Sequence, residues 1–234
     1  MKSTINSNRA TQILSLILAI SAAWTLSSCK NEGCGYADPC IEICQLLDDF
    51  EATETGTPGN WQTLAANASI QVQGSTKTLH LQDQSGASWA FNNVDFPGDL
   101  IQAGCELRYD VEYQAGASNG TTTSNSIHIY QGSSPAAATA KANFVLNSSS
   151  LIVSGAGVSN IVVPIELATG SALPSNAFGQ WFLTGGAVIP TPADIAAFNT
   201  LIQNINGVGF FVDNGSNPAE DWWYDNFCFQ QCCR

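Results

Sequence analysis

Trp-Trp-Tyr-Asp-Asn-Phe-Cys-Phe, residues Trp222–Phe229, is the stretch from which the fold is inferred. Aromatic residues favour strands, and side chains along a strand alternate between its two faces. The stretch therefore predicts a strand that exposes Trp222 and Tyr224 and turns every second residue inward: Trp223, Asp225, Phe227 and Phe229. A carboxylate among aromatic rings is costly to bury unless a metal ion or backbone N–H groups pair with it, so Asp225 becomes a candidate ligand.

A second apolar run, Gly207–Asp213, ends just before Asn214-Gly215. Asn-Gly is a favoured dipeptide in the tight turns of β-hairpins. We therefore predict that this run and Trp222–Phe229 form a terminal hairpin.

The rest of the chain alternates between short apolar runs and turn residues, which is typical of a β-sandwich. In Glu106–Gln114 the polar residues Arg108, Asp110 and Glu112 face solvent, while Leu, Tyr and Val occupy the positions between them. The predicted strands are Ser69–Gln73, Thr76–Gln82, Ser88–Asn93, Glu106–Gln114, Ser124–Gln131, Ala142–Asn147, Asn160–Leu167, Gln180–Leu183, Gly207–Val212 and Trp222–Phe229. The predicted fold class is all-β, a jelly-roll β-sandwich.

Two helices are predicted, one of which interrupts the strands. Thr191 can cap a helix whose first position is Pro192, inserted before the last two strands. Asp38-Pro39 carries the same signal near the N-terminus, and a short helix there places Cys40 and Cys44 on one face.

The N-terminal segment predicts export. The apolar run Ile13–Leu26 is short for a membrane span and suits a signal peptide. The sequence Leu26–Cys29, Leu-Ser-Ser-Cys, resembles the lipobox of bacterial lipoproteins, which implies a lipid on Cys29 and an anchor in the outer membrane or at the cell surface. An ordinary secretory signal is the alternative. The predicted division is a signal peptide at 1–28, a lipidated Cys-rich tether at 29–45 and a β-sandwich at 46–234.

The chain has 234 residues and a formal net charge of −12. Such acidity argues against nucleic acid as a partner. It suits an exported surface domain, and it suits cation binding.

Eight cysteines in an exported chain predict disulfides. With Cys29 lipidated, six cluster at the two ends: Cys34, Cys40, Cys44, Cys228, Cys232 and Cys233. We expect at least one bridge between the ends; the connectivity stays open, and a Cys-ligated zinc site is the alternative. Cys105 either is a buried thiol or pairs with Cys228.

Several short motifs resemble the laminin B (laminin IV type A) domain, in the same order along the chain. They are Leu81–Gly86, Trp89–Phe91, Phe96–Asp99, Leu107–Val111, Trp181 and Gly207–Phe227. The resemblance spans about Phe50–Phe229 and implies a galactose-binding-like jelly roll, an architecture shared with many carbohydrate-binding modules. The cysteine clusters depart from the pattern, and Cys105 stands where glycine is usual.

The same resemblance implies a structural calcium ion between the first and last strands. Calcium takes oxygen ligands, above all carboxylates. The matching residues are Asp49 or Glu51 together with Asp225, and Asp83 is a further candidate. The alternative is that Asp225 accepts backbone N–H groups without a metal.

Sugar binding needs exposed aromatic faces beside hydrogen-bonding groups. The predicted binding face comprises Arg108, Asp110, Glu112, His128, Tyr130, Trp222 and Tyr224. Gly116–Gly120 matches G-x-S-x-G, but it lies between two strands, whereas a nucleophile elbow lies between a strand and a helix. We therefore expect no catalytic residue, and a surface lipoprotein that binds glycan or another extracellular polymer. The second hypothesis is a structural component of the cell envelope, and the third is a carbohydrate-active enzyme.

Overall fold

The computed structural model describes residues 44–84, 87–116, 121–214 and 220–231. All of them lie in the second of the two compact units into which the chain divides, Ile41–Arg234. The predicted signal peptide lies outside the described residues, as do the cysteines Cys29, Cys34, Cys40, Cys232 and Cys233. Within the described ranges, no helix is long and apolar enough to cross a membrane.

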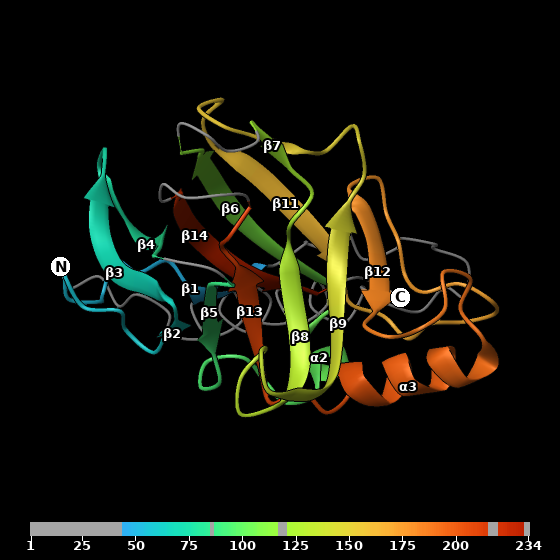
Figure 1. The fold of residues 1–234 in the computed structure, drawn as a ribbon. Coiled ribbons are helices and arrows are strands. Elements are labelled where there is room, and N and C mark those ends of the chain that lie inside the picture. The colour runs from blue at the N-terminus through green and yellow to red at the C-terminus, as the bar shows by residue number, and fades with distance from the viewer. Residues whose placement is uncertain (1–43, 85–86, 117–120, 215–219, 232–234) are drawn as a thin grey trace, which may run out of the picture. The chain divides into compact units, whose positions relative to one another are not determined.

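Two antiparallel six-stranded sheets form the fold (Figure 1). The first sheet has the order β11 (Ser159–Pro164), β6 (Glu106–Gln114), β14 (Asp221–Gln230), β4 (Thr76–Asp83) and β3 (Ala66–Gln73), and β1 (Cys44–Asp48) also pairs with β14. The second has the order β12 (Gly179–Leu183), β9 (Ala138–Leu146), β8 (Ile127–Gly132), β13 (Gly207–Phe211), β5 (Trp89–Asn92) and β2 (Gln62–Leu64). Two short strands pair separately, β7 (Thr122–Thr123) and β10 (Ile152–Val153). The all-β sandwich is confirmed, and each predicted strand overlaps an observed one.

The inner faces of the two sheets enclose an aromatic core. Phe210 of β13 stacks on Tyr224 of β14, with ring centroids 4.1 Å apart. Tyr109 of β6 meets Phe210 edge-on at 5.5 Å. Such ring pairs add to the stabilisation that comes from burying the area, so they fix how the sheets lie against each other.

The predicted terminal hairpin is wrong. Strand β13 lies in the second sheet and pairs with β5 and β8, whereas β14 lies in the first sheet. Both edges of β13 are therefore already occupied. The rings of Phe210 and Tyr224 pack face to face between the sheets, which is incompatible with hydrogen-bonding the two strands side by side.

Strand β14 contains a bulge that changes the predicted facing of its side chains. Its register with β6 shifts between Asp225 and Cys228, and Asn226 has a left-handed φ of 53°. A bulge inserts one residue out of phase, so Tyr224 and Phe227 both point into the core. Trp222 and Tyr224, predicted to face outward, are thus buried at 0% and 3% exposure.

Helix α3 (Pro192–Ile202) is confirmed where the sequence predicts it, and Figure 1 shows it at the foot of the second sheet. Thr191 accepts from the backbone N–H of Asp194, whose carboxylate accepts from the backbone N–H of Thr191, which is a capping box. A second, short helix that the sequence did not predict is α2 (Leu100–Ala103).

A disulfide joins the two ends of the described chain. Cys44 of β1 is bonded to Cys228 of β14, which confirms the predicted bridge between the terminal clusters. Cys44 lies in a strand, so the predicted N-terminal helix does not include it. The other residues predicted for that helix lie outside the described residues. Cys105 also takes part in a disulfide, so neither a buried thiol nor pairing with Cys228 is correct for it.

Candidate functional site

The outer face of the first sheet carries a row of polar side chains beside an aromatic ring. Asp110 and Glu112 leave β6 on this face, as the alternation of that strand predicted. Across the β6–β14 ladder, Glu112 lies opposite Trp223, and Asp110 lies opposite Asp225. The bulge is the reason that Trp223 and Asp225 are here rather than in the core.

His80 of β4 supports the Trp223 ring. The two rings stack with centroids 5.0 Å apart and an interplanar angle of 24°. Asp221 Oδ1 lies 2.8 Å from His80 Nε2, and Gln71 Nε2 lies 2.8 Å from His80 Nδ1. Because both ring nitrogens have partners, the imidazole is held in place and fixes the indole that it covers.

A groove of about 360 Å³ opens beside this ring. This volume lies in the range of about 300–1,000 Å³ that is usual for small-molecule sites. We call it the outer groove; its lining residues are Gln73, Gly74, Thr76, Thr78, Asp110, Val111, Glu112, Val158, Trp223, Asp225 and Asn226. It runs from the β3–β4 turn across β14 to β6.

Hydrogen bonds hold two of the groove's carboxylates in position. Asp110 accepts from the side-chain amides of Asn160 at 2.9 Å and Asn226 at 2.8 Å. Glu112 Oε2 accepts from Gln73 Nε2 at 2.7 Å. The oxygens are therefore oriented before any ligand arrives.

Asp225 is the most strongly perturbed of these groups. Burial raises the pKa of its carboxyl to about 6, and the nearby charges of Asp110, Asp49 and Glu51 add to this, while the N–H of Asn226 at 2.8 Å opposes it. At neutral pH the groove is acidic, and it loses negative charge as the pH falls through about 6.

The remaining predicted binding residues do not line the outer groove. Arg108 is on the same face but pairs with Glu106, with Nη2 and Oε2 2.9 Å apart. His128 and Tyr130 are on β8 of the second sheet, not beside β6, so their placement on this face is wrong. Trp222 and Tyr224 belong to the core.

His128 and Tyr130 instead join a small aromatic cluster on the outer side of the second sheet. The ring of His128 meets Trp89 edge-on at 4.9 Å, and the ammonium of Lys141 lies 4.7 Å from the Trp89 ring centroid. Burial, with the Lys141 charge, lowers the pKa of His128 to about 3. Burial also raises the pKa of Tyr130.

The predicted calcium ligands lie near one another without forming a compact cluster. Asp49 Oδ1 accepts from the backbone N–H of Glu51 at 3.2 Å, and Glu51 Oε1 accepts from the backbone N–H of Lys77 at 2.8 Å. The ammonium of Lys77 donates to the carbonyl oxygens of Glu51 and Thr53. A calcium ion held by Asp49, Glu51 and Asp225 stays a prediction.

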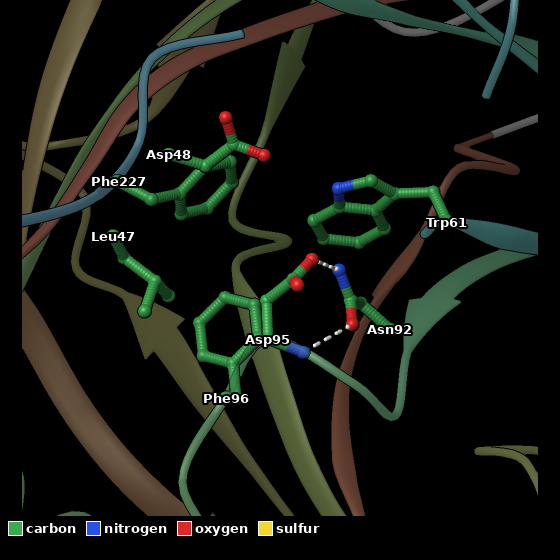
Figure 2. Close-up of a pocket in the computed structure, with 7 residues that line it drawn as sticks. All are labelled: Leu47, Asp48, Trp61, Asn92, Asp95, Phe96 and Phe227. Carbon is green, nitrogen blue, oxygen red and sulfur yellow. Dashed lines mark hydrogen bonds between the residues drawn. The ribbon is translucent and has the colours of Figure 1, made fainter. Parts of the chain in front are cut away.

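Two other hollows offer fewer polar groups to a ligand than the outer groove does. The first, drawn in Figure 2, is closed by aromatic rings, and Asn92 and Asp95 bond each other within it at 2.6 Å and 3.0 Å; its lining residues are Leu47, Asp48, Trp61, Asn92, Asp95, Phe96 and Phe227. The second, of about 410 Å³, lies beside β1 and is lined by Gln45, Leu47, Val94, Asp95, Phe96, Pro97, Ala103 and Phe229. Its lining is mostly apolar, so it offers few groups for a hydroxylated ligand.

Sequence reasoning missed the aromatic residue of the outer groove. It assigned Trp223 to the core, because it assumed unbroken alternation through Phe229. Asn226 could have indicated the bulge, since asparagine is enriched at left-handed backbone positions.

Comparisons with known proteins identify the fold. No protein-family model matches the chain, and no curated protein matches it. Among solved structures, the chain is similar to an exo-beta-agarase at 16% identity and a TM-score of 0.52, covering 81% of this chain and 25% of that one. It is also similar to CtCBM11 at 13% identity and a TM-score of 0.48, covering 84% and 99% of the two chains. Its identity to the L4b domain of human laminin alpha-2 is 10%, with a TM-score of 0.42 and coverage of 70% and 83%. The chain spans about a quarter of the agarase that it matches, and it shares with that part an all-β sandwich fold.

Proposed function

We propose that the β-sandwich binds carbohydrate in the outer groove without cleaving it. The observation that carries this proposal is the Trp223 ring, supported by His80 and flanked by oriented carboxylates in a groove of about 360 Å³. A sugar ring has apolar C–H faces and hydroxyl groups at its rim. The indole suits the first and the carboxylate and amide groups suit the second.

The open groove suits a polymer better than a small metabolite. It lies on the outer surface of a sheet, and Gln73, Thr76 and Val158 are among its lining residues. Because the fold also forms part of an exo-beta-agarase, agarose and its oligosaccharides are the first probes. With a lipid on Cys29, the domain would hold such a polymer at the outer membrane or the cell surface.

One observation favours a catalytic alternative. Asp225, with a pKa of about 6, lies opposite Asp110, and glycosidases use a pair of carboxyl groups of which one is a proton donor. We prefer binding, because both oxygens of Asp110 accept amide hydrogen bonds and the groove is open to solvent. Release of reducing ends from agarose, lost in Asp110→Asn, would establish the catalytic alternative instead.

Affinity electrophoresis in gels that contain agarose, a galactan or a glucan tests the proposal. The wild-type protein should be retarded by at least one polymer, and Trp223→Ala should lose most of that retardation. Phe182→Ala is the matched control, because Phe182 is an exposed aromatic residue of β12 in the other sheet. If no glycan of a broad array retards the wild type, a structural role in the cell envelope becomes the better explanation.

The lipid anchor has its own test. Cys29→Ser should abolish lipid labelling and release the protein from the membrane fraction, with polymer binding unchanged. An unchanged membrane fraction in that variant would reject the anchor.

A further inference from the structure

Three carboxylates that come from different segments meet at one end of the sandwich. Asp83 ends β4, Asp213 follows β13, and Glu220 precedes β14. Their ligand oxygens all lie within 4.8 Å of one another, and among the described residues they are the group of three acidic, histidine or cysteine side chains that meets this limit. Asp83 and Glu220 are buried at 2% and 0% exposure.

Glu220 presents an oxygen that has no partner. Its Oε2 accepts from the backbone N–H of Asn214 at 2.6 Å. Its Oε1 is buried and accepts no hydrogen bond. A buried carboxylate oxygen without a partner is costly. Burial raises the pKa of Glu220, and the charges of Asp83 and Asp213 add to this, while the N–H of Asn214 and the hydroxyl of Tyr113 oppose it.

At Asp83, two oxygen acceptors share one hydroxyl donor. The hydroxyl of Ser88 contacts both Asp83 Oδ1 and the carbonyl oxygen of Ala65, but it has a single proton to donate. Of the two ion pairs given for the described residues, neither includes the buried carboxylates of Asp83 and Glu220.

We propose that Asp83, Asp213 and Glu220 bind one calcium ion, with Glu220 Oε1 as a ligand. Calcium–oxygen distances are about 2.3–2.6 Å. Oxygens up to 4.8 Å apart can therefore all contact one such ion placed between them. Magnesium needs shorter bonds of about 2.0–2.1 Å, and zinc prefers nitrogen and sulfur ligands.

The ion would join parts of both sheets. Asp213 follows β13 of the second sheet, while Asp83 ends β4 and Glu220 immediately precedes β14, both strands of the first sheet. The resemblance implied a site at Asp49 or Glu51 with Asp225, to which Asp83 was a further candidate; the site proposed here shares only Asp83 with it, and the experiment separates the two.

Terbium luminescence on the purified full-length protein, first shown to be metal-free, reports binding directly. Terbium replaces calcium in oxygen sites and is sensitised by nearby tryptophan. Trp222 is close enough to serve, because its indole donates to the carbonyl oxygen of Val212, next to Asp213, at 3.1 Å. We expect one terbium ion per chain, displaced by calcium and not by an equal concentration of magnesium.

Thermal unfolding of the same protein gives a second readout. A hundredfold excess of calcium over its Kd raises the free energy of unfolding by about 2.7 kcal/mol, which corresponds to a Tm rise of about 5–10 °C in a domain of this size. Glu220→Gln and Asp213→Asn should both lose this rise and the terbium signal. Asp225→Asn should keep them.

Three results would overturn the proposal. One is a metal-free wild type whose Tm does not change with calcium and which gives no luminescence with terbium. Another is loss of the response in Asp225→Asn with retention in Glu220→Gln, which would place the ion in the outer groove. The third is an equal response to magnesium. If Glu220→Gln does not fold, Asp213→Asn and the wild-type titration still decide the matter.

Discussion

Asp225 lies directly opposite Asp110 across strands β14 and β6, and both carboxylates line the outer groove. Burial, with a smaller contribution from the charge of Asp110, raises the pKa of Asp225 to about 6 from a usual value of 3.8. The groove that is proposed to bind sugar thus changes its charge within a pH range that is easily reached in experiments.

The raised pKa of Asp225 predicts how stability depends on pH. Between about pH 3.8 and 6 the folded state binds this proton more tightly than the unfolded state, so this group's contribution to stability falls as the pH rises through that window. Asp225→Asn removes the titration. The variant should gain stability relative to wild type as the pH is raised from 4 to 7, as measured by urea unfolding. A difference that stays constant over this range would show that the carboxyl is not perturbed.

The bulge residue Asn226 should resist replacement by a β-branched residue. Its φ of 53° is unfavourable for valine, so Asn226→Val should cost about 1–3 kcal/mol of unfolding free energy. Asn160→Val is a close control, because Asn160 also donates its amide to Asp110 but lies in the regular strand β11. Equal losses in the two variants would assign the cost to the hydrogen bond rather than to the backbone.

His128 should stay neutral in mildly acidic solution. Its pKa of about 3 lies below the value of 6.5 for an unburied imidazole, so the unfolded state binds this proton more tightly between about pH 3 and 6.5, and acid in this range weakens the fold. NMR of the imidazole should show no titration of His128 between pH 8 and 4.5. In His128→Gln, the free energy of unfolding should fall less over this pH range than it does in the wild type. Titration of the wild-type His128 ring near pH 6 would contradict its buried placement.

The Cys44–Cys228 disulfide should contribute strongly to stability. It joins residues 184 apart in sequence, and a loop of this length corresponds to about 5 kcal/mol in the loop-entropy model. Replacing both cysteines by serine should lower the free energy of unfolding by about 2–5 kcal/mol, as measured by urea denaturation. A loss under 1 kcal/mol would mean that hydrogen bonds to β14 and the packing of Leu47 hold β1 without the disulfide.

The sequence predicted those elements whose signals are local. Polar and apolar residues alternate without interruption through Glu106–Gln114, and β6 has the same bounds. Thr191 and Pro192 mark the start of α3, because caps act within one turn of a helix. The clustering of cysteines at the two ends predicted a bridge between them, although not that Cys44 would take Cys228.

The elements that were predicted wrongly depend on pairing between strands distant in sequence. Only the short β7 separates β6 from β8 along the chain, so the prediction placed His128 and Tyr130 of β8 beside Arg108 of β6. The chain instead crosses to the opposite sheet between them, as Greek-key connections do. Trp222 was misplaced because period-2 reasoning fails at a bulge, and a bulge depends on how two strands align.

The bulge also divides β14 into two segments that can vary independently. The segment before Asn226 presents its outward positions to the groove, and the segment after it carries Cys228 and holds β1. Substitutions at positions 223 and 225 therefore do not disturb the alternation of the half that closes the domain. For protein engineering, positions 223 and 225 can be varied to change ligand preference while the disulfide and the β1–β14 pairing are left unchanged.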